Sequence, residues 1–325
     1  MPSLRLHCGR GMTRYFIALT ALPLIAAATP GHWTTGPSLP VARSEVAIAM
    51  LDRRIYVIGG SANGNVDQSL VQVFRPVKQN GQVTGEWHDA APLPRGLNHV
   101  GAVAYRGKVY TFGGFSEQNS AAVDNAYVYD PATNRWSSIA GLPHPLGSVS
   151  VAVLGEEIHL VGGREVHSVR THWVYDPATN RYSERAPLPI GRDHMGLVGF
   201  EDRLYAVGGR IDTPAHNTSY LDIYDPATNA WTSGSPMPTA RSGMAVVVYY
   251  GKVFAMGGEA SGMASAFTTN EAYDPSTNAW DEFAPLPVGL HGTGAAVIGR
   301  RLYVPGGAPV PGGSRQSNAL LIFTL

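Results

Sequence analysis

Thiols and surplus charge are what this sequence has least of. Its 325 residues include a single cysteine, Cys8, and only 15% of them are charged. The 24 Lys and Arg residues equal the 24 Asp and Glu residues in number. The net charge therefore gives no indication of a nucleic-acid partner or of a membrane surface, and any charge that serves a function has to be local.

An apolar run long enough to span a membrane is also missing near the N-terminus. The run from Tyr15 to Leu24, which follows Arg14, is well short of the ~20 residues that a spanning helix needs. Ala26-Ala27-Ala28 then fits an A-x-A cleavage site. We therefore expect a signal peptide over residues 1–28 and a mature chain, residues 29–325, that is periplasmic or extracellular.

Translation could start at Met1 or at Met12, and either leader leaves a mature chain without a thiol. The mature chain would then have no disulfide framework, no cysteine nucleophile and no thiolate-bound metal. After removal of the leader we expect neither membrane association nor nucleic-acid binding.

Glycine pairs divide the rest of the chain into repeats. Each pair ends a run of β-branched and aromatic residues, as in Arg54-Ile55-Tyr56-Val57-Ile58-Gly59-Gly60. The other pairs are Gly113-Gly114, Gly162-Gly163, Gly208-Gly209, Gly257-Gly258 and Gly306-Gly307. Successive pairs are 54, 49, 46, 49 and 49 residues apart. A period near 50 indicates one closed repeat structure, although the length alone would allow two domains.

The second repeat shows the plan of each unit. Two runs with a period of two, Val100 to Tyr105 and Lys108 to Phe112, are joined by Arg106-Gly107. A third run ends at Tyr129, and Trp136 follows in a fourth. Short turns between such runs predict a four-stranded antiparallel unit. The 38 Gly and 24 Pro residues are typical of an all-β protein with many turns.

Four of the turns between the third and fourth strands share the sequence Asp-Pro-Ala/Ser-Thr-Asn. They begin at Asp130, Asp176, Asp225 and Asp274. Asp caps such a turn through its side chain, Pro presets φ at the second position, and Asn tolerates the left-handed region. We interpret the glycine pairs as points of close backbone approach and not as phosphate-binding loops, because no strand-loop-helix pattern surrounds them.

These marks together resemble the kelch repeat, in which a glycine pair precedes a Tyr by about 16 residues and a Trp by about 7 more. The resemblance covers roughly Trp33 to Leu325 and implies an all-β, six-bladed β-propeller with four-stranded antiparallel blades. Three departures are local. Phe74-Arg75-Pro76 replaces Tyr-Asp-Pro, Tyr182 replaces Trp, and Pro305 precedes the last glycine pair.

The last repeat ends after its third strand, before any Trp. Trp33 stands before Leu39-Pro40 as Trp87 stands before Leu93-Pro94. We therefore expect the N-terminal segment around Trp33 to close the ring as the outer strand of the last blade, which also covers an open sheet edge. A six-residue insertion, centred on Lys78 to Thr84, lengthens the last turn of the first repeat.

Alignment of the repeats on the glycine pair brings basic residues to one mouth of the expected channel. The arginines are Arg43, Arg192 and Arg241, which begin the innermost strand, and Arg164 and Arg210, which follow the glycine pair. The histidines are His99, His194 and His291. Arginine forks bind carboxylates and phosphates through paired hydrogen bonds. We expect these residues to bind an anionic small molecule such as an acidic sugar, or an acidic peptide or protein segment.

A second interpretation of the arginines stays open. Each could pair with a neighbouring carboxylate, Glu45, Asp193 or Glu259, and so tie blades together. No ligand spacing marks a metal site, and no nucleophile elbow predicts a Ser-His-Asp triad. We therefore expect no metal and no cofactor.

An enzyme is the alternative to a binding protein. Among exported kelch propellers the chain looks like the periplasmic N-acetylneuraminate epimerase (mutarotase) group, which handles a carboxylated sugar. The resemblance implies that arginine holds the carboxylate while Glu259, Glu45 or a histidine such as His194 moves protons during ring opening. Galactose oxidase, another kelch enzyme, needs a cysteine linked to a tyrosine. A mature chain without cysteine excludes that copper chemistry.

Overall fold

The computed structural model describes residues 1–3, 29–79, 82–117 and 119–325. The predicted signal peptide falls almost wholly on residues 4–28, outside the described residues. Within the described part of the chain, no helix combines the length and apolar character needed to cross a membrane.

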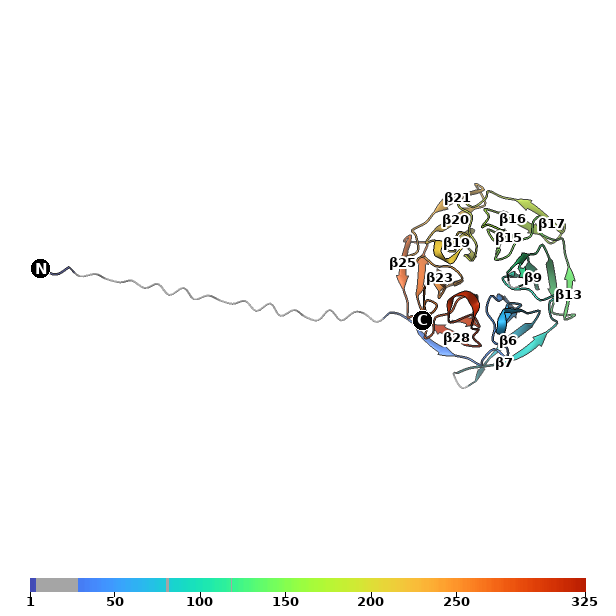
Figure 1. Cartoon of the computed structure of the whole chain (residues 1–325), viewed down its shortest axis with the longest axis horizontal. Helices are drawn as coiled ribbons and strands as arrows, with labels where there is room; N and C mark the ends of the chain where they lie inside the picture. Colours follow the sequence, from blue (N-terminus) through green and yellow to red (C-terminus); the bar gives the residue numbers. More distant parts are fainter. Residues whose placement is uncertain (4–28, 80–81, 118) are drawn as a thin grey trace.

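Six four-stranded antiparallel sheets surround a central axis and form a β-propeller, as predicted (Figure 1). From the axis outwards, blade 1 is β2 (Ala47–Leu51), β3 (Arg54–Ile58), β6 (Val71–Gln79) and β7 (Gln82–Ala90). Blade 2 is β8 (Gly101–Tyr105), β9 (Lys108–Phe112), β12 (Ala126–Asp130) and β13 (Arg135–Ser138). Blade 3 is β14 (Ser150–Leu154), β15 (Glu157–Val161), β16 (His172–Asp176) and β17 (Arg181–Glu184).

The remaining blades repeat this plan. Blade 4 is β18 (Gly196–Phe200), β19 (Arg203–Val207), β20 (Leu221–Asp225) and β21 (Ala230–Ser233). Blade 5 is β22 (Ala245–Tyr249), β23 (Lys252–Met256), β24 (Asn270–Asp274) and β25 (Ala279–Glu282). Blade 6 is β26 (Ala296–Ile298), β27 (Arg301–Pro305), β28 (Leu320–Thr324) and β1 (His32–Thr35).

Short elements fill the loops that leave the second strand of several blades. They are the hairpins β4 (Ser61–Ala62) with β5 (Val66–Asp67) and β10 (Phe115–Ser116) with β11 (Ala121–Ala122), and the 3-10 turns η1 (Asn63–Asn65), η2 (Pro214–His216) and η3 (Pro311–Gly313).

The ring closes through the N-terminal strand, as the position of Trp33 predicted. Strand β1 pairs antiparallel with β28, and Trp33 lies opposite Phe323 with their rings 5.0 Å apart. The Trp33 indole also donates a hydrogen bond of 2.8 Å to the Ala284 carbonyl of blade 5. The two ends of the described propeller therefore share one sheet, which removes an open edge.

Rings from the second strand of each blade pack against rings from the third strand of the next, all the way around. The six pairs, with centroid distances of 5.9–6.2 Å, are Tyr56–Tyr129, Tyr110–Tyr175, His159–Tyr224, Tyr205–Tyr273, Phe254–Phe323 and Tyr303–Phe74. A histidine takes the place of Tyr or Phe only in blade 3, among these six pairs. Blade-to-blade packing is therefore a repeated aromatic contact.

The outermost strands are held together by a second repeated contact. Trp136 donates its indole N–H to the Ala91 carbonyl at 2.8 Å, and Tyr182, which replaces Trp in blade 3, reaches the Ala140 carbonyl with its hydroxyl at the same distance. The turn asparagines have positive φ, as predicted, and Asn134 accepts hydrogen bonds from Tyr129 in its own blade and from the Ala91 N–H. The departure at Tyr182 thus keeps the contact between blades.

Removal of the Trp33 ring should weaken the closed ring more than removal of an equivalent internal ring. We expect Trp33→Ala to lower the free energy of unfolding by about 2–4 kcal/mol, because a partly buried indole and its hydrogen bond are lost and β1 frays from β28. Trp136→Ala is the matched control, since it loses the same local contacts in a blade whose strands are continuous. Urea unfolding followed by circular dichroism measures both, and equal losses would contradict a special role for Trp33 in closure.

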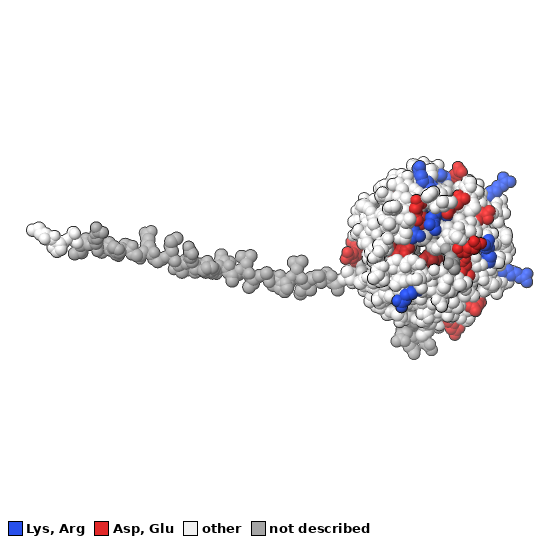
Figure 2. Space-filling model, in the orientation of Figure 1, with Lys and Arg blue, Asp and Glu red and all other residues white. Residues whose placement is uncertain are grey.

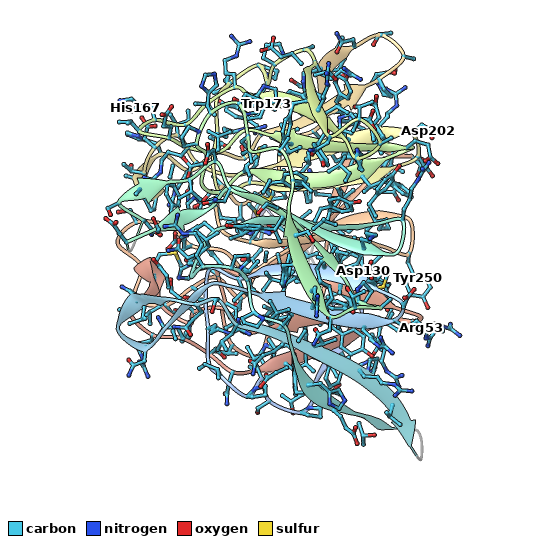
Figure 3. All side chains as sticks on the ribbon, turned by 90° about the vertical axis from the view of Figure 1, so that its right-hand side faces the viewer. Arg53, Asp130, His167, Trp173, Asp202 and Tyr250 are labelled. Carbon is cyan, nitrogen blue, oxygen red and sulfur yellow. The ribbon has the colours of Figure 1, made fainter. Side chains whose placement is uncertain are left out.

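The two faces of the propeller carry different loops. The loop that enters the first strand and the loop that leaves the second lie on one face, which we call the mouth face. In Figure 3 the turns at Arg53, Asp202, Tyr250 and Asp130 lie on the right, and the loop containing His167 lies on the left. The predicted insertion lengthens the β6–β7 hairpin on the side opposite the mouth face, where pairing continues to Gln79 and Gln82.

Candidate functional site

Three of the five predicted mouth arginines lie inside the blades and do not reach the channel. Arg43, Arg192 and Arg241 are each 0% exposed. The Arg192 guanidinium donates to the Asp222 carboxylate at 2.6 Å, and that of Arg241 donates to the Glu271 carboxylate at 2.6 Å. Arg43 donates to the Gln72 side chain at 3.1 Å and to the Gly59 carbonyl at 2.7 Å. The prediction that these three arginines gather at the mouth is therefore corrected.

The partners of these arginines explain why they turn into the blade. Gln72, Asp222 and Glu271 are each the second residue of the third strand. In the other three blades leucine replaces the arginine and an apolar residue replaces its partner, and the two share a core cluster. These pairs are Leu97 with Tyr127, Leu146 with Trp173 and Leu290 with Leu321. Arginine and its third-strand partner thus change together from blade to blade. This paired change is a sequence signal for a buried arginine, and alignment on the glycine pair alone does not reveal it.

A ring of left-handed residues lines the channel next to these positions. Its members are Glu45, His99, Ser148, His194, Gly243 and Gly292, all with φ between 50° and 66°. Backbone N–H groups link neighbouring members, as from His99 to the Glu45 carbonyl at 3.0 Å and from Gly292 to the Gly243 carbonyl at 2.9 Å. Positive φ in non-glycine residues stores strain of order 1–3 kcal/mol each, and such strain clusters at functional sites.

Two cavities meet at this ring. The mouth cavity, about 160 Å³, opens between the loops and is lined by residues such as Ser61, Asn65, Arg210 and Glu259. The channel cavity, about 120 Å³, lies on the other side of the ring. Glu45, His99 and His194 line both cavities, so these three side chains form the boundary between them.

His99 and Glu45 form one half of this boundary. The His99 Nε2 atom lies 2.8 Å from the Glu45 carboxylate, and Nδ1 contacts the Asn98 side-chain oxygen. The Asn98 amide nitrogen donates to Asp67 at 2.6 Å, which turns its oxygen toward His99. Both ring nitrogens of His99 thus face acceptor oxygens. Burial would raise the pKa of Glu45, but the imidazoles of His99, His291 and His194 outweigh it and hold that pKa well below its usual range.

His194 forms the other half and is neutral. Its Nδ1 atom lies against the Asp193 carboxylate, while Arg210 Nη2 lies 2.9 Å from Nε2. Burial lowers the pKa of His194 to about 4, with the Arg210 charge acting in the same direction and Asp193 opposing it. At neutral pH the imidazole therefore donates from Nδ1 to Asp193 and accepts at Nε2.

Arg210 and Glu259 connect blades 4 and 5 at the mouth cavity. The Arg210 guanidinium donates to Glu259 at 2.8 Å and to Asp193 at 3.1 Å. For Arg210, the interpretation as a tie between blades is thus confirmed. His291 Nδ1 lies 3.6 Å from both Glu45 and Glu259 and is buried without a hydrogen-bond partner among the described residues. A buried polar atom without a partner indicates a place for a water molecule or a ligand group.

Arg164 differs from the other four predicted mouth arginines in the contacts that its guanidinium makes. It occupies in blade 3 the position that Arg210 occupies in blade 4, because both pair with the start of the inner strand. Its guanidinium lies 5.0 Å from the centre of the Phe115 ring, and that ring packs edge-on against His99. Among the described residues no carboxylate forms an ion pair with it. Within the described part of the chain Arg164 therefore has no carboxylate partner; it contacts Phe115, which packs against the cavity residue His99, but it is not itself among the residues that line the mouth cavity.

The structure brings together one set of potential metal ligands that sequence spacing could not reveal. Donor atoms of Glu45, His99 and His194 all lie within 4.8 Å of one another. Two imidazoles and a carboxylate suit several divalent metals. Here, however, the Arg210 charge stands 2.9 Å from His194 Nε2, and repulsion from the guanidinium disfavours a cation at that atom.

The charge of the mouth is mixed. Figure 2 shows acidic and basic side chains interspersed around the centre of the mouth face. The cluster described above contains Glu45, Asp193 and Glu259 beside one arginine, Arg210. The continuous cationic ring that the sequence suggested is therefore replaced by a hydrogen-bonded cluster of acids, imidazoles and a single guanidinium.

Two family models match most of the chain. Residues 29–188 match the KLHDC2/KLHL20/DRC7 Kelch-repeats domain, and residues 191–238 and 240–287 match the Kelch motif. The glycine pairs, turn aspartates and outer-strand aromatics described above lie largely within these segments.

Curated relatives and a solved structure agree with these matches. Kelch-like protein terF of Aspergillus terreus is 32% identical over 44% of this chain and 33% of its own length. Kelch-like protein 35 of Mus musculus is 31% identical over 43% of this chain and 22% of its own length. The chain thus spans a third or less of these two relatives. A structure titled "Structure of YjhT" superposes with a TM-score of 0.76 at 17% identity, over 89% of this chain and 97% of that one. A likeness at that identity supports the fold alone.

Proposed function

Because the chain belongs to the kelch-repeat family of β-propellers, we propose that it binds a small acidic sugar at the mouth cavity. A propeller of this kind suits binding, since loops from every blade converge on one opening. In the proposed complex Arg164 takes the carboxylate, and the polar groups around the cavity take the hydroxyls. We further propose, from the leader predicted over residues 1–28, that the protein acts in the periplasm or outside the cell.

The mouth cavity is the observation that carries this proposal. It is lined by hydroxyl, amide, imidazole, carboxylate and guanidinium groups from five of the six blades. Ser44, which lines it, has a buried hydroxyl without a hydrogen-bond partner among the described residues. Its volume of about 160 Å³ fits a small molecule better than an acidic peptide or protein segment, the other partner that the sequence allowed. No metal or cofactor is part of the proposal.

Binding of acidic sugars should depend on Arg164. We expect N-acetylneuraminate or a uronic acid to raise the thermal midpoint of the mature protein, and N-acetylglucosamine to have a much smaller effect. Arg164→Gln should lower affinity for the acidic sugar about tenfold or more, because a charge-assisted hydrogen bond contributes ~1.5–3 kcal/mol. Arg181→Gln is the control, an exposed arginine at the far turn of the same blade. Loss of affinity in both variants, or no response to any acidic sugar, would overturn the proposal.

A mutarotase of the N-acetylneuraminate epimerase type is the second candidate function. The observation that favours it is the neutral His194 at the cavity, held by Asp193 and placed among Glu45, Glu259 and Arg210. Ring opening of a sugar needs a base for the anomeric hydroxyl and an acid for the ring oxygen. His194 supplies an acceptor nitrogen, once a substrate hydroxyl displaces Arg210 from it, and another imidazole of the cluster supplies the proton.

Proton NMR of freshly dissolved N-acetylneuraminate separates the two functions. A mutarotase accelerates interconversion of the anomers at micromolar protein, and His194→Gln should reduce the acceleration at least 100-fold while leaving sugar affinity within a few-fold, because general acid–base catalysis contributes 10²–10⁴-fold. A protein that binds the sugar but leaves the anomer rate unchanged is a binding protein only.

A further inference from the structure

The face opposite the mouth carries an ion pair that recurs in three blades. The first residue of the second strand pairs with the aspartate that ends the third strand. The pairs are Lys108 with Asp130 at 2.8 Å, Arg203 with Asp225 at 3.1 Å and Lys252 with Asp274 at 2.7 Å. In each of these blades the cation beside the turn is thus balanced by a carboxylate from the next strand.

Blade 1 breaks this pattern by placing a second arginine where the aspartate stands. Arg54 begins β3, and Arg75 occupies the position of the turn aspartate. Ile55 pairs with Phe74 in the ladder, so Arg54 and Arg75 are the next neighbours across the two strands. Like charges on neighbouring strands repel each other. The chain has therefore exchanged an attractive pair for a repulsive one at this site.

A cavity, which we call the groove, lies next to the two arginines. Its volume is about 240 Å³, larger than that of the mouth cavity, and it is formed between blades 1 and 2. Arg54, Arg75 and His88 line it on one side, and Tyr129 and Asn134 line it on the other. The long β6–β7 hairpin, which only blade 1 has among the described blades, extends from the same side of the propeller (Figure 3).

The acidic groups near this cavity do not neutralise the arginines. Asp89 lines the cavity, but its carboxylate accepts a hydrogen bond of 3.1 Å from Gln72. Glu86 lies opposite Arg75 in the ladder, yet its carboxylate faces His88 at 3.6 Å. Within the described part of the chain, neither Arg54 nor Arg75 forms an ion pair with a carboxylate. Arg54 contacts the Tyr56 hydroxyl instead.

We propose that the groove between blades 1 and 2 binds the carboxylate or phosphate group of a small anionic ligand, held between Arg54 and Arg75. The ligand group supplies the negative charge that an aspartate provides in blades 2, 4 and 5. Two guanidinium forks around one oxyanion give paired, charge-assisted hydrogen bonds. His88 lies beside them in the same groove. This site is separate from the mouth cavity, which lies on the other face.

Substitution of Arg75 tests the groove through two opposite effects. In sodium chloride, Arg75→Asp should raise the thermal midpoint, because it restores the ion pair of the other blades. In sodium phosphate or sodium succinate at the same ionic strength, the wild-type midpoint should rise by about 2–4 °C, as expected for ~1 kcal/mol of ligand stabilisation in a larger domain. Arg75→Asp should abolish that rise. Phosphate and succinate distinguish a phosphoryl ligand from a carboxylate ligand by which of them gives the larger rise.

Control variants separate this site from charge effects and from the mouth. Arg315→Asp changes the net charge by the same amount at an exposed position and should keep the anion response. Arg54→Gln should weaken the response without creating a new ion pair. Arg164→Gln should keep it, even if the sugar proposal fails. An equal rise in wild type and in Arg75→Asp, or no rise with either anion, would overturn the proposal.

Discussion

Arg192→Leu should lower the free energy of unfolding by about 3–5 kcal/mol at neutral pH, because it leaves a buried carboxylate without a positively charged partner. Arg192 is fully buried and donates to Asp222 at 2.6 Å. Burial raises the pKa of Asp222 even with Arg192 beside it. Without Arg192 that pKa rises further, so the variant's deficit shrinks at acidic pH and grows as the pH rises through the folded-state pKa. Urea unfolding at several pH values measures both effects.

The double variant Arg192→Leu/Asp222→Leu is the matched control for this prediction. It builds into blade 4 the pair that blade 6 already has, Leu290 with Leu321, which share a buried cluster. Replacement of a buried ion pair by apolar residues is often neutral or stabilising. We therefore expect the double variant to recover most of the loss. A double variant as unstable as the single one would show that the pair is not exchangeable between blades.

Acid should destabilise the protein through two buried histidines in blade 3. His159 and His172 hydrogen-bond each other at 2.9 Å, and His172 Nδ1 donates to the Ala186 carbonyl. Burial lowers the pKa of His159 to about 3 and that of His172 to about 4. The unfolded chain binds protons on these rings near pH 6.5. Their stabilisation is therefore complete above that pH and is lost as the pH falls toward 3–4.

The size of the acid effect follows from how far burial lowers the pKa of each histidine. A fall of the pKa from 6.5 to about 3 for His159 and to about 4 for His172 corresponds to roughly 3–5 kcal/mol for each histidine. Glu157 lies 3.4 Å from His159 Nε2 and reduces the loss when it remains charged. Trp231, whose ring lies 5.4 Å from that of His172, gives a local fluorescence signal for the transition.

The other repeats supply the control for the histidine pair. The ring partner at the position of His159 is Tyr or Phe in the remaining blades, and Leu221 and Leu320 stand at the position of His172 in blades 4 and 6. The variant His159→Tyr/His172→Leu should flatten the dependence of unfolding free energy on pH between 6.5 and 4. An unchanged slope would assign the acid sensitivity to other groups.

Most of the fold could be predicted from the sequence because its signals are local and repeated. Glycine pairs, turn aspartates and outer-strand aromatics recur in order, and each has a physical role that its own blade determines. Trp33 was informative for the same reason, since it is the one such aromatic that precedes the first repeat. Tyr182 also preserves a contact that its hydroxyl can make in place of an indole N–H.

The candidate site was harder to predict because neighbouring residues in the segment just before the inner strand point in different directions. Arg192 and His194 are two residues apart, yet the first turns into the blade toward Asp222 and the second borders the channel. The left-handed conformation at Glu45, His99, Ser148 and His194 changes the direction of the chain there, and alignment does not reveal it. The contact between His99 and Glu45 joins two blades, so no spacing within one repeat predicts it.

Titration calorimetry with N-acetylneuraminate tests the central claim most directly, by comparing Arg164→Gln with Arg192→Leu/Asp222→Leu. The claim is that the arginines at the strand starts are structural groups buried inside their own blades, while the mouth cavity and Arg164 bind the acidic sugar. We predict that the double variant keeps the wild-type affinity within about twofold and that Arg164→Gln loses about tenfold or more. Retained binding in Arg164→Gln together with lost binding in a folded double variant would contradict the claim.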